Sequence, residues 1–344
     1  MKKYKSEQEV KIKTLPDKIL NTDYAPPIVP EKKPDPPPDT NNKNQNNTRR
    51  VRNNTYVSMV NEFLGVGGFS KVYRYKKEKD KAIKKIMLDP LIYSTKLPIL
   101  NSVKREVFGM VKCACEHTIK LYDVFQNPAE DTFYLLMELC EGNLEQLITK
   151  LGRPLKTLEI KEILNQLNEV FYKLYLNNII HRDIKPANIL YIEEKNSKKK
   201  GNKNLFDGKI LTFKLTDFGV CLPLYDAKYS ISQFMGTLFF MAPEIYDKRA
   251  SVELPMYTQK IDLFSLGQSI LCLMGFIQKP SPLDFNKCHE LKINNTLFKG
   301  NYEDQLLADL IFNTLLVPDP DYRANWELYF LHPFFEKRPD EYEE

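Results

Sequence analysis

The sequence has few cysteines and no long hydrophobic run. Its 344 residues include six cysteines, too few for the disulfide framework of a small secreted domain. The longest apolar run, residues 269–277, is much shorter than the roughly 20 residues that a membrane-spanning helix needs. The chain opens without a secretory leader, and neither end carries a lipidation motif. We therefore expect a protein without a membrane span in a reducing, intracellular compartment, the cytoplasm or the nucleus.

The chain also lacks a basic domain. Its formal net charge is +5, but residues 1–56 hold 12 Lys and Arg against 7 Asp and Glu, and the other residues hold 38 of each. Nucleic-acid-binding domains usually present a basic face. We therefore expect no nucleic-acid partner.

The first 56 residues are poor in apolar side chains. They contain 8 of the 22 prolines and an asparagine-rich tract, residues 41–54. Such a segment cannot bury enough apolar surface to offset its ordering entropy, so residues 1–56 are predicted to form a disordered arm. Its basic clusters, residues 2–5 and 49–52, could contact acidic lipids or act as a localisation signal. The composition favours the simpler interpretation, a solvated arm.

The remaining residues combine a strand pattern with a helical one, and their apolar content predicts a globular α+β body. One helix, expected to begin near Asn101 or Ser102, interrupts the strands. Helical spacing dominates from Leu158 onwards, and residues 263–277 are apolar on nearly every side, which indicates a buried central helix. The predicted strands are residues 57–64, 71–75, 81–85, 120–125 and 133–139, with a further helix over residues 303–316.

Two charged stretches fall outside this pattern. Residues 191–209 hold six lysines against three acids and have no apolar period, which predicts an inserted surface loop. A solvated loop is the favoured interpretation, and a docking site for an acidic partner is the alternative. Residues 338–344 are predicted to form an acidic tail.

The residues that carry chemistry begin with residues 181–190, which read His-Arg-Asp-Ile-Lys-Pro-Ala-Asn-Ile-Leu. This stretch places a carboxylate (Asp183), an ammonium (Lys185) and an amide (Asn188) within six residues, and Pro186 restricts the backbone between them. These groups suit the transfer of a phosphoryl group. Asp217, in Thr-Asp-Phe-Gly, is expected to join Asn188 as a ligand of Mg²⁺, which prefers carboxylate and amide oxygens.

A glycine-rich turn lies between the first two predicted strands. Residues 65–72 read Gly-Val-Gly-Gly-Phe-Ser-Lys-Val, and the glycines let backbone N–H groups approach phosphate oxygens. Such a turn alone is more often a simple hairpin, but Lys84 follows on the third strand. Glu106 lies on the apolar face of the predicted helix, where a carboxylate is costly unless it is paired. We therefore expect an ion pair that positions Lys84 for the α and β phosphates.

In this order, the segments resemble the eukaryotic protein kinase family over residues 57–337. The resemblance extends to Met-Ala-Pro-Glu at residues 241–244, to Asp262 and the five residues after it, and to Arg323. It implies a two-lobed α+β fold, with a small, mostly antiparallel β lobe over residues 57–139 that contains one key helix. A larger, mainly helical lobe would follow over residues 140–337.

The resemblance implies a serine/threonine protein kinase that transfers the γ-phosphate of ATP to hydroxyl groups of protein substrates, with Mg²⁺ or Mn²⁺. Asp183 would accept the hydroxyl proton, Lys185 would neutralise charge on the moving phosphoryl group, and Thr237 would bond to both. The implied ATP-binding residues are Leu64, Gly65, Val66, Gly67, Gly68, Phe69, Ser70, Val72, Ala82, Lys84, Met137, Glu138, Cys140 and Leu190.

The same resemblance implies three structural arrangements. These are a stack of Met110, Leu121, His181 and Phe218, an ion pair of Glu244 with Arg323, and support of the catalytic loop by Asp262. Ala187 and Asn143 provide no acid to read substrate arginines, so strong selection for basic substrates is not expected.

Control by phosphorylation stays open in the sequence. Arg182 before Asp183 is the form linked to phosphorylation of the activation loop, where a phosphate pairs with arginine. Gln233, however, stands where the phosphorylated residue often lies. The remaining candidate sites are Tyr225, Tyr229, Ser230 and Ser232.

Three other interpretations are disfavoured. A pseudokinase or scaffold commonly lacks at least one of Lys84, Glu106, Asp183, Asn188 and Asp217, which are all present. A small-molecule kinase of related fold does not account for residues 236–237 and 241–244. A metal site at residues 113–117, Cys-Ala-Cys-Glu-His, lacks a second cysteine pair at zinc-like spacing, and we expect these cysteines to pack at the end of the Glu106 helix.

Overall fold

The computed structural model describes residues 60–67, 70–87, 97–127, 132–194, 205–224, 235–247, 257–277, 290, 299–335 and 341. The chain divides into two compact units. The first holds the chain up to Val103 together with Leu121–Leu139, and the second holds Lys104–Lys120 together with Cys140–Glu344. The predicted N-terminal arm and, except for residue 341, the predicted acidic tail lie outside the described residues.

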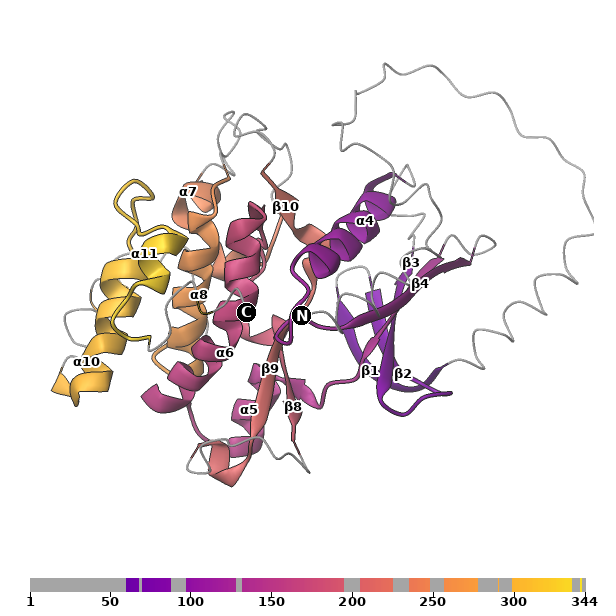
Figure 1. The fold of residues 1–344 in the computed structure, drawn as a ribbon, viewed down its shortest axis with the longest axis horizontal. Coiled ribbons are helices and arrows are strands. Elements are labelled where there is room, and N and C mark those ends of the chain that lie inside the picture. Colours follow the sequence, from indigo (N-terminus) through magenta and orange to yellow (C-terminus); the bar gives the residue numbers. More distant parts are fainter. Residues whose placement is uncertain are drawn as a thin grey trace, which may run out of the picture. The chain divides into compact units, whose positions relative to one another are not determined.

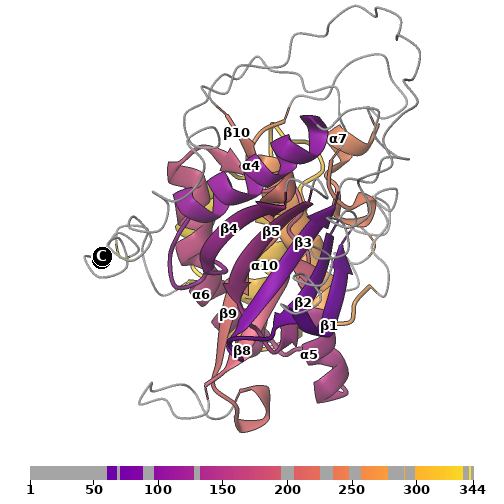
Figure 2. The same ribbon diagram turned by 90° about the vertical axis from the view of Figure 1, so that its right-hand side faces the viewer.

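The first unit is built on one five-stranded sheet with the order β1-β2-β3-β5-β4 (Figures 1 and 2). All four neighbouring pairs of strands are antiparallel, which confirms the small antiparallel β part of the expected fold. The strands are β1 (Val60–Gly67), β2 (Ser70–Tyr75), β3 (Lys81–Met87), β4 (Leu121–Asn127) and β5 (Thr132–Glu138).

Of the three inner strands, β3 and β5 are mostly buried, whereas β2 is not. Ile83 on β3 and Leu135 on β5 are completely buried. The register pairs Ala82 with Met137 and Lys84 with Leu135. The apolar residues of the two strands therefore fix where Lys84 lies along the sheet.

Helix α4 (Leu97–Lys112) begins four residues before the predicted start at Asn101. A helix start is weakly encoded when the residues before it are not polar caps, and here Leu97 and Pro98 open the helix. From Lys104 onwards the helix belongs to the second unit. There it buries Val107 and Met110 together with Glu106, which is 2% exposed, on the face that the apolar spacing predicted.

The second unit is mainly helical, which confirms the larger part of the expected α+β fold. Helix α6 contacts both α10 and α11, and α5 contacts α8 (Figure 1). The helices are α5 (Leu144–Leu151), α6 (Thr157–Leu176), α7 (Pro243–Tyr246), α8 (Lys260–Leu273), α10 (Tyr302–Asp309) and α11 (Trp326–Phe330). None of the helices in the described ranges is both long and apolar enough to cross a membrane.

Helix α8 is the predicted central helix, and its residues from Ile261 to Leu271 are all buried. It ends at Leu273 rather than at Ile277, because Gly275 takes a left-handed backbone with φ 74°. The predicted helix over residues 303–316 is divided: α10 ends at Asp309, and Leu310–Leu315 continue as a π-helix. The side-chain period alone does not reveal this change of winding.

Five short strands complete the second unit. They form one sheet with the order β6-β8-β9 and a separate pair, β10 with β7. The strands are β6 (Gly142–Asn143), β7 (Ile179–Ile180), β8 (Ile189–Glu193), β9 (Leu211–Leu215) and β10 (Leu222–Pro223).

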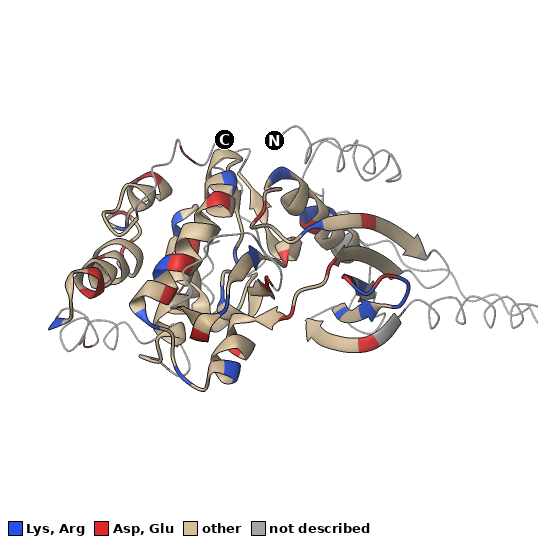
Figure 3. Cartoon of the chain, turned by 60° about the horizontal axis from the view of Figure 1, so that its bottom comes forward, with Lys and Arg blue, Asp and Glu red and all other residues tan. Residues whose placement is uncertain are grey.

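The two ends of the predicted lysine-rich insert are part of this packed unit. Residues 191–193 belong to β8, and Phe206 is buried in the 3₁₀ turn Phe206–Gly208. Residues 195–204 lie outside the described residues. Lys and Arg are interspersed with Asp and Glu along the described helices and strands (Figure 3), in line with the even charge balance of the sequence.

Glu159, near the start of α6, binds the chain at Phe206, just after the residues of the lysine-rich insert that lie outside the described ranges. Its carboxylate accepts two hydrogen bonds from the Arg153 guanidinium, both at 2.8 Å, and one each from the N–H groups of Lys156 and Phe206, both at 2.9 Å. The Glu159 side chain is 1% exposed. Burial acts to raise the pKa of this carboxyl, but the Arg153 guanidinium and the two N–H groups outweigh it and hold the pKa below its usual range.

We expect Glu159→Gln to lower the free energy of unfolding by about 3 kcal/mol at pH 7, because one amide oxygen cannot accept four donors and Arg153 loses its buried partner. Urea denaturation measures this difference. Since the folded pKa is lowered, the stabilisation is present above the unfolded pKa of about 4.3 and is lost as the pH falls through the folded pKa.

The matched control is Glu145→Gln on the exposed side of α5, which should change stability by less than about 0.5 kcal/mol. A difference between wild type and Glu159→Gln that stays constant from pH 7 to pH 3 would contradict the role of the ionised carboxylate.

Candidate active site

The loop that contains Asp183 is held by sheets at both ends. It follows β7, which pairs with β10, and it leads through the 3₁₀ turn Pro186–Asn188 into β8, which pairs with β6 and β9. These short pairings fix both entry and exit of the loop, so its side chains have defined positions.

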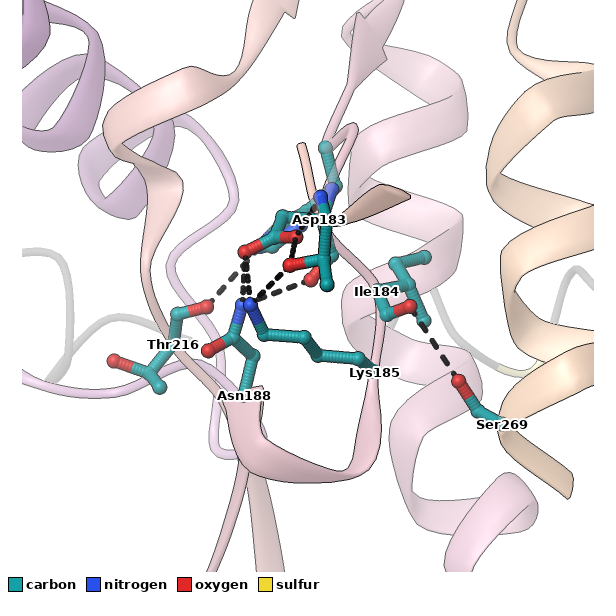
Figure 4. Close-up of polar contacts among 8 residues, drawn as sticks. Asp183, Ile184, Lys185, Asn188, Thr216 and Ser269 are labelled. Atoms are coloured by element: carbon teal, nitrogen blue, oxygen red, sulfur yellow. Dashed lines mark hydrogen bonds and ion pairs between the residues drawn. The ribbon is translucent and has the colours of Figure 1, made fainter. Parts of the chain in front are cut away.

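Four hydrogen-bond donors converge on the Asp183 carboxylate. Lys185 Nζ and Asn188 Nδ2 each lie 2.8 Å from Oδ2 (Figure 4). The N–H group and the hydroxyl of Thr237 donate to Oδ1 at 2.9 Å and 2.7 Å. The structure therefore brings together the three loop residues that the sequence grouped and Thr237, 54 positions further along the chain.

Thr237 also contacts Lys185, whose Nζ lies 2.5 Å from the threonine hydroxyl oxygen. This approach depends on Gly236, which has a left-handed backbone with φ 108°. A Cβ atom at this position would lie 2.3 Å from the carbonyl oxygen of Arg182. Gly236 is therefore required for the backbone to pass close enough to place Thr237 against Asp183.

Asp262 on α8 supports the loop from below, as the resemblance implied. Its carboxylate accepts the N–H groups of His181 at 2.6 Å and Arg182 at 2.8 Å, and the residue is completely buried. Burial raises the pKa of Asp262 to about 7, although the two N–H groups and the charge of Arg182 act to lower it. Arg182 has a left-handed backbone with φ 66°, a conformation that these bonds help to hold.

His181 is a packed residue of the site. Its Nδ1 accepts the N–H of Asp183 at 3.3 Å, so Nε2 carries the proton and donates to the carbonyl oxygen of Thr216 at 3.1 Å. Burial lowers the pKa of the His181 imidazole, which favours this neutral form. The ring meets Phe218 edge-on, with 4.9 Å between the centroids.

The predicted stack of Met110, Leu121, His181 and Phe218 is divided between the two units. Phe218 lies against Gly109 on α4, where an added Cβ would approach the ring to 2.6 Å. Met110 is the next residue of α4 and is buried, whereas Leu121 belongs to the first unit. The complete four-residue stack therefore stays a prediction.

Asn188 and Asp217 are brought close by the pairing of strands β8 and β9. Just beyond this pairing, the N–H of Thr216 donates to the carbonyl oxygen of Asn188 at 3.0 Å. Asp217 therefore directly follows the residue bonded to Asn188, and it has a left-handed backbone with φ 65°. The Asn188 amide nitrogen points toward Asp183 and its side-chain oxygen points to the other side (Figure 4). An amide oxygen and a carboxylate are the hard donors that suit Mg²⁺.

The predicted ATP-binding residues fall into two groups. In the first unit, Leu64, Gly65, Val66 and Gly67 lie on β1, and Gly67 pairs with Ser70 across the turn. Val72, on β2, pairs with Lys84 on β3, and Ala82 pairs with Met137 on β5. Gly68 and Phe69 lie outside the described residues.

The second group belongs to the second unit. Leu190 on β8 pairs with Asn143 on β6, and the N–H of Glu141 donates to the carbonyl oxygen of Tyr191 at 3.0 Å, which holds the chain next to Cys140. Glu138 belongs to the first group instead, because it lies on β5 of the first unit, where it pairs with Lys81. Because Lys84 and Glu106 also belong to different units, their ion pair stays a prediction.

The residues of the suspected metal motif have other contacts. Cys115 Sγ lies 3.3 Å from the Thr118 hydroxyl oxygen, and His117 Nδ1 lies 2.8 Å from the Phe213 carbonyl oxygen. Cys113 is completely buried just beyond the end of α4. In the part of the chain that the structure describes, no group of three or more His, Cys, Asp or Glu side chains is placed to hold a metal ion.

Comparison with known proteins decides the family. A sequence profile described as the protein kinase domain matches residues 58–335, which is most of the chain. The chain belongs to the protein kinase family.

Several curated relatives resemble this kinase domain at modest identity. A putative serine/threonine-protein kinase, R517/R518, of Acanthamoeba polyphaga mimivirus is 27% identical over 299 residues, which cover 82% of this chain and 64% of the relative. Calcium-dependent protein kinase 3 of Plasmodium yoelii yoelii is 28% identical over 290 residues, or 82% of this chain and 48% of the relative. Serine/threonine-protein kinase 10-A of Xenopus laevis is 28% identical over 285 residues, or 80% of this chain and 27% of the relative. The aligned part thus spans less than two thirds of each of these relatives.

The kinase domain also contains the predicted ion pair of Glu244 with Arg323. The two guanidinium nitrogens of Arg323 lie 2.7 Å and 2.9 Å from the two carboxylate oxygens of Glu244. Arg323 Nη1 also donates to the carbonyl oxygen of Lys260 at 3.1 Å, at the start of α8. The pair therefore ties α7 to the first turn of the central helix.

Several residues of the kinase domain were missed from the sequence. Ser265 donates from α8 to the carbonyl oxygen of Phe240 at 2.7 Å. The Ser269 hydroxyl oxygen lies 2.8 Å from the Ser265 carbonyl oxygen within α8 and 3.4 Å from that of Ile184 in the loop. Their spacing from Asp262, three and seven residues, is helical and is the signal that could have found them. Arg105 donates to the carbonyl oxygen of Gly219, and Cys221 donates to that of Arg105. No local sequence pattern indicates either contact.

We expect Asp262→Ala to destabilise the kinase domain by about 3 kcal/mol, because it leaves the N–H groups of His181 and Arg182 buried without their acceptor. Ser269→Ala, on the same helix, removes one long hydrogen bond to the loop and one within α8, leaves no backbone N–H group without an acceptor, and should cost less than about 1 kcal/mol. Urea denaturation of both variants measures the difference. Equal destabilisation by the two variants would show that the Asp262 carboxylate is not the main support of the loop.

Proposed function

We propose that the chain is a serine/threonine protein kinase that transfers the γ-phosphate of ATP to serine and threonine hydroxyls of protein substrates. The observation that carries this proposal is the Asp183 carboxylate, which is oriented by Lys185, Asn188 and Thr237. The names of the relatives, which include serine/threonine-protein kinases, support the choice of acceptor.

Asp183 is the proposed base. Its carboxylate already accepts a hydroxyl hydrogen bond from Thr237 at 2.7 Å, so the site suits a donor of the same chemistry from a substrate side chain. Lys185 lies beside the same carboxylate, where its ammonium would neutralise charge on the transferred phosphoryl group. Catalysis would then come from positioning and electrostatics rather than from a covalent intermediate.

Asn188 and Asp217 are the proposed ligands of Mg²⁺ or Mn²⁺. When bound, the metal ion would supply positive charge that offsets the negative charge of the ATP phosphates. The glycine-rich turn, residues 65–70, and Lys84 are proposed to hold the phosphates, and the other residues of the predicted set are proposed to surround the nucleotide.

The substrate preference is proposed from what stands near the loop. Asn143 caps α5, where its side-chain oxygen accepts the N–H of Gln146 at 3.0 Å, and Ala187 has no polar side chain. Neither position offers an acid to substrate arginines, so we propose no strong selection for basic substrates. The N-terminal arm and the lysine-rich insert, residues 191–209, are proposed as solvated segments, with docking to a partner as the alternative.

Arg182 supports control by phosphorylation. Its Nε donates to the carbonyl oxygen of Val220 at 2.6 Å, and its guanidinium lies over the Tyr257 ring. Its Nη1 is buried without a hydrogen-bond partner in the described part of the chain, so it is a donor that a phosphate on the activation loop would satisfy. The candidate sites Tyr225, Tyr229, Ser230 and Ser232 lie outside the described residues, as does Gln233.

The decisive test is transfer of radiolabelled γ-phosphate from ATP to a generic protein substrate in Mg²⁺ or Mn²⁺. We expect transfer by the wild type and a loss of at least about 100-fold in Asp183→Asn, because the amide cannot accept the hydroxyl proton. The matched control, Asp321→Asn at an exposed position, should be unaffected. No transfer by the wild type with either metal would favour the alternative of a pseudokinase or scaffold that binds nucleotide with little catalysis.

We expect Lys84→Met to lose phosphate transfer while keeping the fold, because the ammonium proposed to bind the α and β phosphates is removed. Lys85→Met, the next residue of β3, has its side chain on the opposite face of the strand and should stay within about twofold of the wild type. The assay is the same, with thermal unfolding as the check on folding. Wild-type turnover by Lys84→Met would contradict the proposed role of Lys84.

A further inference from the structure

Two reciprocal hydrogen bonds join helix α4 to the segment that follows Asp217. Arg105 Nε donates to the carbonyl oxygen of Gly219 at 3.2 Å, and Cys221 Sγ lies 3.2 Å from the carbonyl oxygen of Arg105. Each segment thus supplies one donor and one acceptor to the other. Both bonds lie within the second unit.

The chemistry of Cys221 makes it a hydrogen-bond donor. The residue is completely buried, and burial raises the pKa of its thiol to about 12, although the charges of Arg182 and Arg105 act to lower it. The sulfur therefore keeps its proton at neutral pH and donates it to the Arg105 carbonyl oxygen. A buried neutral thiol also reacts slowly with alkylating reagents.

The two bonds lie next to groups of the proposed reaction. Arg105 directly precedes Glu106, whereas Gly219 and Cys221 are two and four residues beyond Asp217. Phe218 packs against Gly109, one turn further along α4, so the contact between the segments extends over two turns of the helix.

Asp217 needs such support because of its backbone conformation. Its φ of 65° and ψ of 62° are in the left-handed region, which aspartate enters more easily than most residues but still at a cost that surrounding contacts offset. These two angles set the direction of the Cα–Cβ bond, and with it the range of positions that the carboxylate can reach. Contacts that fix the residues just after Asp217 therefore restrict where its carboxylate can point.

We propose that Cys221 and Arg105 are positioning residues, which hold the Asp217 carboxylate in its metal-binding orientation by tying its segment to the helix that carries Glu106. This proposal rests on the proposed kinase function for its activity readout, but the contact itself is tested independently below.

The first test removes the thiol donor and follows the metal dependence of phosphate transfer. In Cys221→Val, we expect the Mg²⁺ concentration for half-maximal activity to rise about threefold to tenfold, the effect of losing one neutral hydrogen bond, with the KM for the protein substrate unchanged. Cys221→Ser keeps a donor and should stay close to the wild type. Cys272→Val, a half-buried cysteine on α8, is the matched control and should not change the Mg²⁺ dependence.

The second test does not depend on activity. Arg105→Met keeps the length of the side chain but loses Nε, so the segment is held by one bond less and Cys221 should be alkylated by iodoacetamide several-fold faster. Mass spectrometry of the labelled peptides measures the rate, and Cys113, also completely buried, is the internal control that should stay slow.

The double variant tests whether the two hydrogen bonds act together on one segment or act independently. If both bonds hold the same segment, Cys221→Val with Arg105→Met should shift the Mg²⁺ dependence by less than the product of the single shifts. Wild-type Mg²⁺ dependence in Cys221→Val, or unchanged Cys221 labelling in Arg105→Met, would overturn the proposal. If the wild type transfers no phosphate, the kinase proposal fails, and the labelling result alone then decides whether the contact exists.

Discussion

The site depends on one buried carboxylate, that of Asp262. It lies on a helix that is buried on nearly every side, and it is the acceptor for two consecutive backbone N–H groups of the loop, those of His181 and Arg182. A buried backbone donor without a partner is costly, so these bonds strongly favour one position of the loop. Ser265 on the same helix donates to the carbonyl oxygen of Phe240, three residues beyond Thr237, whereas the hydroxyl of Ser269 lies closest to the Ser265 carbonyl oxygen of its own helix. The central helix therefore presents Asp262 to the loop and Ser265 to the segment that follows Thr237.

This support gives the Asp183 carboxylate a fixed direction. Donors from the loop bind one of its oxygens and Thr237 binds the other, and the approach of Thr237 requires the absence of a side chain at Gly236. Such a cluster is ordered before a substrate binds, which is what catalysis by positioning and electrostatics requires. Under the proposed function, the work of the second unit is to hold a base, a cation and two metal ligands in a constant arrangement.

Two other polar contacts fix the segments that lie next to this arrangement in the fold. Glu159 binds the N–H of Phe206 where the chain returns toward β9, so the lysine-rich stretch leaves and rejoins the fold at fixed points. The reciprocal bonds between Arg105 and the segment after Asp217 do the same for α4. In both cases a polar contact with a buried side chain connects segments that are distant in sequence, and each contact is specific because that side chain is shielded from water.

Much of the fold follows from short-range patterns in the sequence. The predicted strands lie within a few residues of β1 to β5, because alternation and turn residues define a strand locally, and the all-round apolar pattern of residues 263–277 located the buried helix α8. The errors have local causes as well. Helix α4 begins before its polar residues, and a π-helix replaces the end of the predicted helix at residues 303–316. Helices α5 and α11 were missed because they have only eight and five residues, although Asn143 and Asn325 cap them and gave a signal.

The sequence by itself determined which chemical groups the site contains, since Asp183, Lys185, Asn188, Asp217 and Thr237 are all recognisable from their motifs. It also placed Glu106 on the buried face of its helix, because that depends only on helical spacing. The resemblance also implied the Thr237 contact and the support by Asp262. Only the tertiary structure decided which atoms of these groups meet, and that Cys221 and Glu159 take part. These contacts join residues up to 116 positions apart, and no local pattern encodes a distance that depends on how the whole unit packs.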